Sequence, residues 1–118
     1  MKRTLALAWS LAVFVACSIP GDDLPSTTFV PFSQDKWIHL IMFFGIGWLW
    51  VRATPDRLRA VAVGGLAFAV GIEVWQAALP IGRSGDPLDA LADAVGLALG
   101  MWIAVRLRRR PPAPQPVA

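Results

Sequence analysis

Ionisable and amide side chains recur at helical spacing in separate parts of this 118-residue chain. One group contains Asp35, Lys36 and His39, and a second pairs Glu73 with Gln76. Residues three or four apart lie on one face of a helix, so each group can present its polar atoms together. Imidazole and carboxylate groups can exchange protons with a substrate, which makes His39 and Glu73 the candidate catalytic residues.

A third group consists of one arginine and three aspartates between residues 83 and 93. Asp86, Asp89 and Asp93 have a three-then-four spacing and therefore line one stripe of a predicted helix. Arg83 in the preceding turn could grip a carboxylate or a phosphate with two hydrogen bonds. In a catalytic site, Asp89 would orient His39 or Arg83. Asp93 could be protonated, pair with one of the same two residues, or change what the site binds. The predicted ligand-binding residues are Asp35, Lys36, Gln76, Arg83, Asp89 and Asp93.

The same residues allow a metal reading and a purely structural one. His39 with Glu73, Asp89 and Asp93 could hold a divalent cation. The chain has one histidine and one cysteine, Cys17, so we predict no metal site, no cofactor and no internal disulfide. A network of hydrogen bonds and ion pairs that docks the helices would need the same side chains. No Ser-His-Asp pattern or phosphate loop supports a particular reaction, and the sequence leaves enzymatic activity open.

The elements that must position these groups are apolar stretches, each close in length to the roughly 20 residues that a helix needs to cross a bilayer. Hydrophobic residues make up 56% of the chain and charged residues 16%, which is unlike a soluble domain. The four stretches are Thr4 to Ile19, Trp37 to Val51, Leu58 to Leu79 and Leu88 to Val105. The second is short, so its helix should include Asp35, Lys36 and Arg52 as flanks. We predict an all-α integral membrane bundle of four transmembrane helices over residues 1–110, with a proline-rich disordered tail at 111–118.

Basic residues predict the orientation of this bundle. Nine of the eleven lysines and arginines precede the first stretch, separate the second from the third, or follow the fourth. Because such residues are retained in the cytoplasm, both termini should be cytoplasmic and the polar groups should face outward. The clusters do not form one basic stripe, so we predict no nucleic-acid partner.

The first stretch admits an alternative. Phe14 to Ser18, after Lys2 and Arg3, resembles a lipoprotein signal box in which Cys17 would be lipidated after cleavage. Three spans would then remain. The simpler interpretation keeps Cys17 as a small apolar residue near the end of an uncleaved helix.

The order of the groups resembles the VanZ-like family, which is named for a membrane protein associated with teicoplanin resistance. The resemblance is carried by Asp35-Lys36-x-x-His39, Glu73-x-x-Gln76, Pro80, Arg83 and Asp89-x-x-x-Asp93-x-x-Gly96-x-x-x-Gly100. Asp93 stands where the family usually has Asn. Gly96 and Gly100 lie on one face and predict close approach of a neighbouring helix. The resemblance implies a link to glycopeptide resistance but names no reaction.

We therefore expect an outward-facing polar pocket that binds, and could modify, a lipid-linked envelope precursor or a lipid-tailed glycopeptide. Membrane lipids are the other expected partners, and the oligomeric state is undetermined. The main alternative is a non-catalytic scaffold or assembly partner whose polar layer is structural. A transporter or proton path is disfavoured because the inner halves of the stretches lack acidic residues and histidine.

Overall fold

Four helices make up the regular structure of the computed structural model, which describes residues 1–19, 34–79, 87–108 and 113–117, with only the backbone at 34 and 35. They are α1 (Lys2–Cys17), α2 (Gln34–Ala53), α3 (Leu58–Ala78) and α4 (Pro87–Arg108). The described ranges contain no strand. The prediction of an all-α chain with four helices is confirmed.

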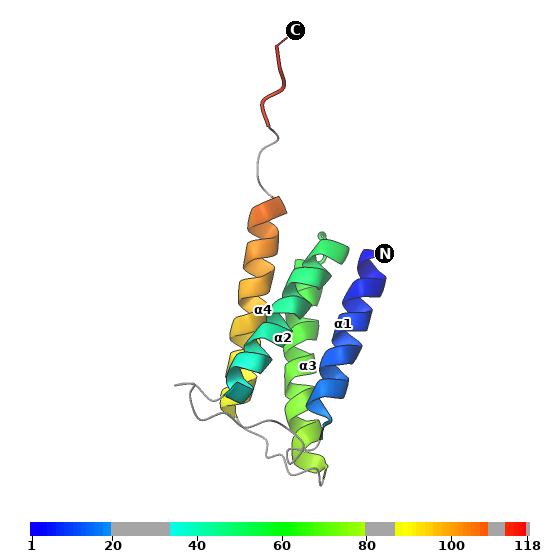
Figure 1. Ribbon diagram of the computed structural model, residues 1–118, viewed down its shortest axis with the longest axis vertical. Helices are drawn as coiled ribbons and strands as arrows, with labels where there is room; N and C mark the ends of the chain where they lie inside the picture. Colours follow the sequence, from blue (N-terminus) through cyan, green and yellow to red (C-terminus); the bar gives the residue numbers. More distant parts are fainter. Residues whose placement is uncertain (20–33, 80–86, 109–112, 118) are drawn as a thin grey trace.

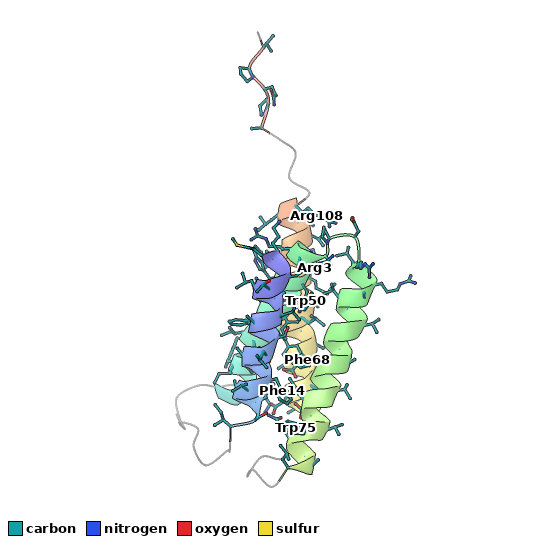
Figure 2. The ribbon with its side chains drawn as sticks, turned by 90° about the vertical axis from the view of Figure 1, so that its right-hand side faces the viewer. Arg3, Phe14, Trp50, Phe68, Trp75 and Arg108 are labelled. Carbon is teal, nitrogen blue, oxygen red and sulfur yellow. The ribbon has the colours of Figure 1, made fainter. Side chains whose placement is uncertain are left out.

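The helices run alternately up and down, so the start of α1, the end of α2, the start of α3 and the end of α4 share one end of the bundle (Figure 1). Figure 2 shows Arg3 and Arg108 at this end, and Phe14 and Trp75 toward the other. We call it the basic end, because the described helix termini and the 54–57 link bring together Lys2, Arg3, Arg52, Arg57, Arg59, Arg106 and Arg108.

Helix α2 is longer than the apolar stretch within it, as we expected because that stretch is too short to cross a bilayer. It begins at Gln34 and ends at Ala53, so it includes the predicted charged flanks. At its end, the Thr54 amide and hydroxyl both donate to the Trp50 carbonyl oxygen, each at 2.8 Å. Pro55 then stops the helix, because proline has no amide hydrogen to donate.

Glycine allows α2 and α4 to pack closely. A Cβ atom added to Gly96 would collide with the backbone oxygen of Leu40, and one added to Gly100 would collide with that of Phe44. Across the same interface, a Cβ atom at Gly47 would lie 2.5 Å from a backbone oxygen of α4. The predicted close approach at Gly96 and Gly100 is therefore confirmed, and it fixes which turns of the two helices face each other.

The core lies where α2, α3 and α4 meet, and α1 covers it from one side. Phe43, Ala69, Ile72 and Leu97 are buried together there with Val13 of α1. The outside of the bundle is also apolar, with exposed residues that include Leu5, Leu11, Ile41, Val63, Val70, Leu91 and Leu99.

Two helices of the described chain, α3 and α4, are long and apolar enough to cross a membrane. Helix α1 has 16 residues and α2 carries charged residues near both ends, so neither meets this criterion. In their most apolar segments, 22% of α3 and 39% of α4 residues are buried. A helix at the core of a soluble protein would be mostly buried, so the exposed apolar surface favours a membrane environment.

Candidate functional site

A buried histidine and aspartate join α2 to α4. The Nδ1 atom of His39 lies 2.7 Å from the Oδ1 atom of Asp93, and the two side chains are 1% and 0% exposed. The close contact between Gly96 of α4 and the Leu40 backbone of α2 brings the two side chains together. Leu40 directly follows His39 in the chain, and Gly96 lies three residues after Asp93. An ionised carboxylate only accepts hydrogen bonds, so with ionised Asp93 the Nδ1–H group of His39 is the donor. Of the two aspartates expected to contact His39, Asp93 makes this bond.

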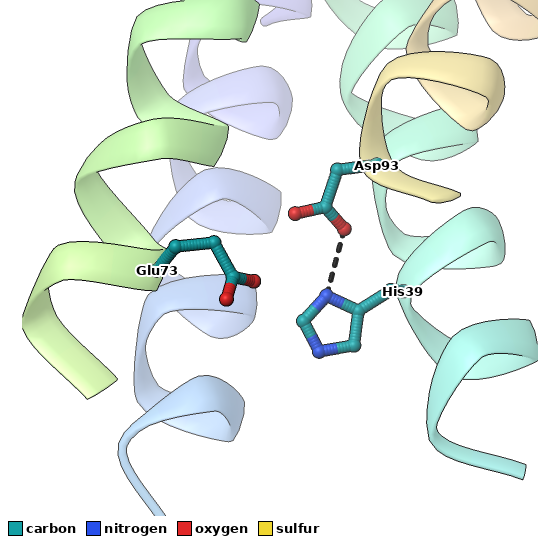
Figure 3. Close-up of side chains that lie close together, drawn as sticks. All are labelled: His39, Glu73 and Asp93. Carbon is teal, nitrogen blue, oxygen red and sulfur yellow. Dashed lines mark hydrogen bonds and ion pairs between the residues drawn. The ribbon is translucent and has the colours of Figure 1, made fainter. Parts of the chain in front are cut away.

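Glu73 brings α3 to the same place. Its half-buried side chain extends toward the His39–Asp93 pair from the opposite side (Figure 3). One ligand atom from each of the three residues lies within 4.8 Å of the other two. We call these three residues the polar cluster. Three helices each contribute one ionisable side chain to it.

The polar cluster has the donor types of a divalent-cation site, one imidazole nitrogen and two carboxylates. It contains three of the four residues that the sequence suggested for a cation. The fourth, Asp89, takes part in a separate ion pair with Lys36. The His39–Asp93 bond already engages one donor atom from each residue. A cation bound there would have to use their other donor atoms or replace that bond.

The Lys36–Asp89 pair forms a second charged link between α2 and α4. The Lys36 Nζ atom lies 3.5 Å from an Asp89 carboxylate oxygen, and the side chains are 14% and 6% exposed. The pair lies nearer the start of both helices than His39 and Asp93 do. Two contacts between ionisable side chains, one turn apart, thus join the same two helices. The predicted ligand-binding roles of Lys36 and Asp89 stay predictions.

Gln76 docks α1 onto α3. Its side chain is 1% exposed, and its Nε2 group donates to the backbone oxygen of Cys17 at 3.0 Å. The last carbonyl groups of a helix have no partner within it, so this bond satisfies one of them. The predicted ligand-binding role of Gln76 stays a prediction, and the structure adds a structural role.

The sequence did not predict the contacts around this docking point. The Nε1 group of Trp75 donates to the Ser18 hydroxyl at 3.0 Å, and the rings of Phe14 and Trp75 lie 5.5 Å apart. Trp75 stands beside Gln76 in the sequence, but an aromatic residue near a helix end usually signals membrane anchoring rather than a helix contact. No sequence signal pointed to Ser18.

Some predicted residues lie outside the described part. Arg83 and Asp86 are among them, and Asp35 is described only by its backbone in the first turn of α2. Residues 113–117 are exposed and carry no helix or strand. The predicted roles of Asp35 and Arg83, the domain limits and the disorder of the tail stay predictions.

The position of Cys17 bears on the lipoprotein alternative. Cys17 is 1% exposed and belongs to the core together with Val13. Trp9, nearer the start of α1, donates from Nε1 to the Met42 backbone oxygen at 2.9 Å. Cleavage before Cys17 would remove both Trp9 and Val13 from the bundle, so the packing favours the uncleaved helix.

Comparison with known proteins agrees with this geometry. A family model described as VanZ/LLP1 matches residues 3–108, which include all four helices and every residue of the polar cluster. No curated protein and no solved structure matches the chain. The chain has two helices long and apolar enough to cross a membrane, and together with the family match they indicate a membrane protein. This chain belongs to the VanZ/LLP1 family.

Proposed function

We propose that this protein binds the polar part of an amphiphilic cell-envelope molecule at the end of the bundle opposite the basic end. The observation that carries the proposal is the polar cluster itself, in which His39, Glu73 and Asp93 meet from three different helices. The lipid tail of such a molecule would lie along the apolar outside of the helices, and its polar part would reach the cluster.

The cost of placing ionisable groups in a membrane supports this proposal. A charged side chain at the centre of a membrane helix costs about 2.5–3.5 kcal/mol on insertion scales, and such residues mark functional sites by default. Glu73 is half-buried, unlike the fully buried His39 and Asp93, so it is the member of the cluster best placed to meet a ligand.

The proposed membrane arrangement has four spans. Helices α3 and α4 cross the bilayer on their own length and composition, and α1 and α2 cross with them because they pack alongside in the same bundle. The basic end faces the cytoplasm, which places both termini there and the polar cluster toward the outer face of the bacterial inner membrane.

A catalytic role is the second candidate, and the His39–Asp93 bond is the observation that favours it. A carboxylate bonded to Nδ1 of a histidine fixes the ring and leaves Nε2 to accept a proton, as in enzymes that use histidine as a general base. Glu73 would then exchange a proton with the bound molecule. The proposal assigns no reaction, and binding without turnover fits the same geometry.

Variants that preserve shape separate binding from a purely structural network. Glu73→Gln keeps the size of the side chain but removes its charge, so it should abolish binding while the folded protein stays at its normal level. Ser18→Ala is the structural control, because it removes the hydrogen bond that Trp75 of α3 donates at the end of α1 and changes no residue of the proposed binding site.

Two measurements serve as the readout. One is native mass spectrometry of the detergent-purified chain with a lipid diphosphate probe, farnesyl diphosphate. The other is teicoplanin susceptibility of a bacterial host that expresses each variant at the same membrane level. The binding proposal fails if Glu73→Gln leaves probe binding and teicoplanin susceptibility at their parental values. It also fails if Glu73→Gln acts only by lowering the amount of folded protein, as Ser18→Ala would, because the polar cluster is then a structural network.

A further inference from the structure

A hollow of about 380 Å³ lies between α1, α2 and α3, away from the polar cluster. Its wall is formed by Ile46 and Trp50 of α2, by Ala60, Gly64 and Phe68 of α3, and by Ser10 of α1. Figure 2 shows Trp50 and Phe68 between the ribbons of α1 and α3. The wall extends from the middle of the bundle, at Phe68 and Ser10, toward the basic end, and we call this hollow the basic-end groove.

Packing of α3 against α4 leaves the groove open. Gly65 faces α4, where a Cβ atom would lie 2.6 Å from a Leu97 methyl carbon. Its neighbour Gly64 lines the groove, and a Cβ atom there would meet no atom within 4 Å. Gly65 also lines the groove, so α3 borders it with two residues that have no side chain, and the space beside Gly64 is unfilled.

The polar groups in the wall are already used within the protein. The Ser10 hydroxyl donates to the Ala6 backbone oxygen at 2.9 Å and accepts from the Trp50 Nε1 group at 3.0 Å. The Thr54 hydroxyl donates to the Trp50 backbone oxygen. An occupant of the groove would therefore meet an apolar surface, which suits a hydrocarbon chain.

A positive charge stands at the mouth of this apolar surface. Arg57 lines the groove, is exposed, and precedes the first residue of α3. Its side chain makes no hydrogen bond or ion pair with any residue that the structure describes. In the second hollow at this end, by contrast, Arg108 donates to the Pro55 backbone oxygen and Arg52 lies over the Trp48 ring.

We propose that the basic-end groove binds one anionic glycerophospholipid, with an acyl chain along the Trp50–Gly64–Phe68 wall and the phosphate at Arg57. Basic pockets between transmembrane helices bind anionic head groups, and each lysine or arginine near the membrane surface adds attraction. The groove contains no residue of the polar cluster, so lipid binding there can be tested independently of the proposed envelope ligand.

The test is native mass spectrometry of the full chain in detergent, titrated with phosphatidylglycerol or with phosphatidylcholine of the same acyl chains. We expect one phosphatidylglycerol per chain, bound about fivefold more tightly than phosphatidylcholine. Arg57→Gln should remove that preference, and Arg59→Gln, which changes a basic residue outside the groove, should keep it. Gly64→Leu should fill the groove and prevent binding of both lipids.

Gly71→Leu is the control for Gly64→Leu, since a side chain at Gly71 also meets no atom within 4 Å and lies outside the groove. If Gly64→Leu loses its helical circular dichroism, Ala60→Leu fills the groove from the next turn. The proposal is overturned if both filling variants keep the lipid, or if the two lipids bind equally. It is also overturned if filling the groove breaks a dimer, because a second chain is then the occupant.

Discussion

Alanine at Gly96 should destabilise the bundle, whereas alanine at Gly71 should stabilise it. At Gly96 the added methyl group would collide with the Leu40 backbone oxygen, which cannot rotate away as a side chain could. At Gly71 it would meet no atom within 4 Å. The same substitution, in two helices of one bundle, is therefore predicted to have opposite effects.

The size of the difference follows from two terms. Alanine favours a helix over glycine by about 1 kcal/mol, and both variants gain this term. Forcing an extra group into a packed interface costs about 1–3 kcal/mol, and only Gly96→Ala incurs this cost. The propensity term cancels in the comparison, so the two variants should differ by about 1–3 kcal/mol. At roughly 4 °C per kcal/mol, their unfolding midpoints should differ by about 4–12 °C.

Two assays check this prediction. Thermal unfolding in detergent, followed by circular dichroism, compares the two variants with the parent chain. The imidazole nitrogen NMR spectrum reports the His39–Asp93 bond without ambiguity, because the chain has one histidine. Gly96→Ala should shift that signal and Gly71→Ala should leave it in place. Equal midpoints for the two variants, with an unchanged histidine signal, would refute the close α2–α4 contact.

Three further predictions concern the site and the topology. Gln76→Leu should lower the free energy of unfolding by about 0.5–1.5 kcal/mol, since it removes a buried hydrogen bond between α3 and α1, and an unchanged melting curve would contradict this. Elemental analysis of the purified protein should find no divalent cation at one per chain, because the His39–Asp93 bond competes for the donor atoms; a retained cation that Glu73→Gln removes would show the opposite. Cysteine at Asp56 should react with a membrane-impermeant reagent only after cells are opened, and labelling of intact cells would reverse the proposed orientation.

The sequence determined the elements of this protein. The four helices follow from runs of apolar residues that are separated by proline, glycine and charged residues. Helix α2 extends over its charged flanks because its apolar stretch alone is short. The spacing of Gly96 and Gly100 gave the close helix contact, since only small residues let two backbones approach. These features depend on neighbouring residues in the chain and can be read locally.

Only the tertiary structure decided which groups meet. Helical spacing says which residues share a face, but the partner on another helix depends on how far the two helices are shifted along each other. The contact between Gly96 and Leu40 sets that shift for α2 and α4, and with it the pairing of His39 with Asp93. The basic-end groove is likewise absent from any local pattern, because it exists only where three helices leave a space between them.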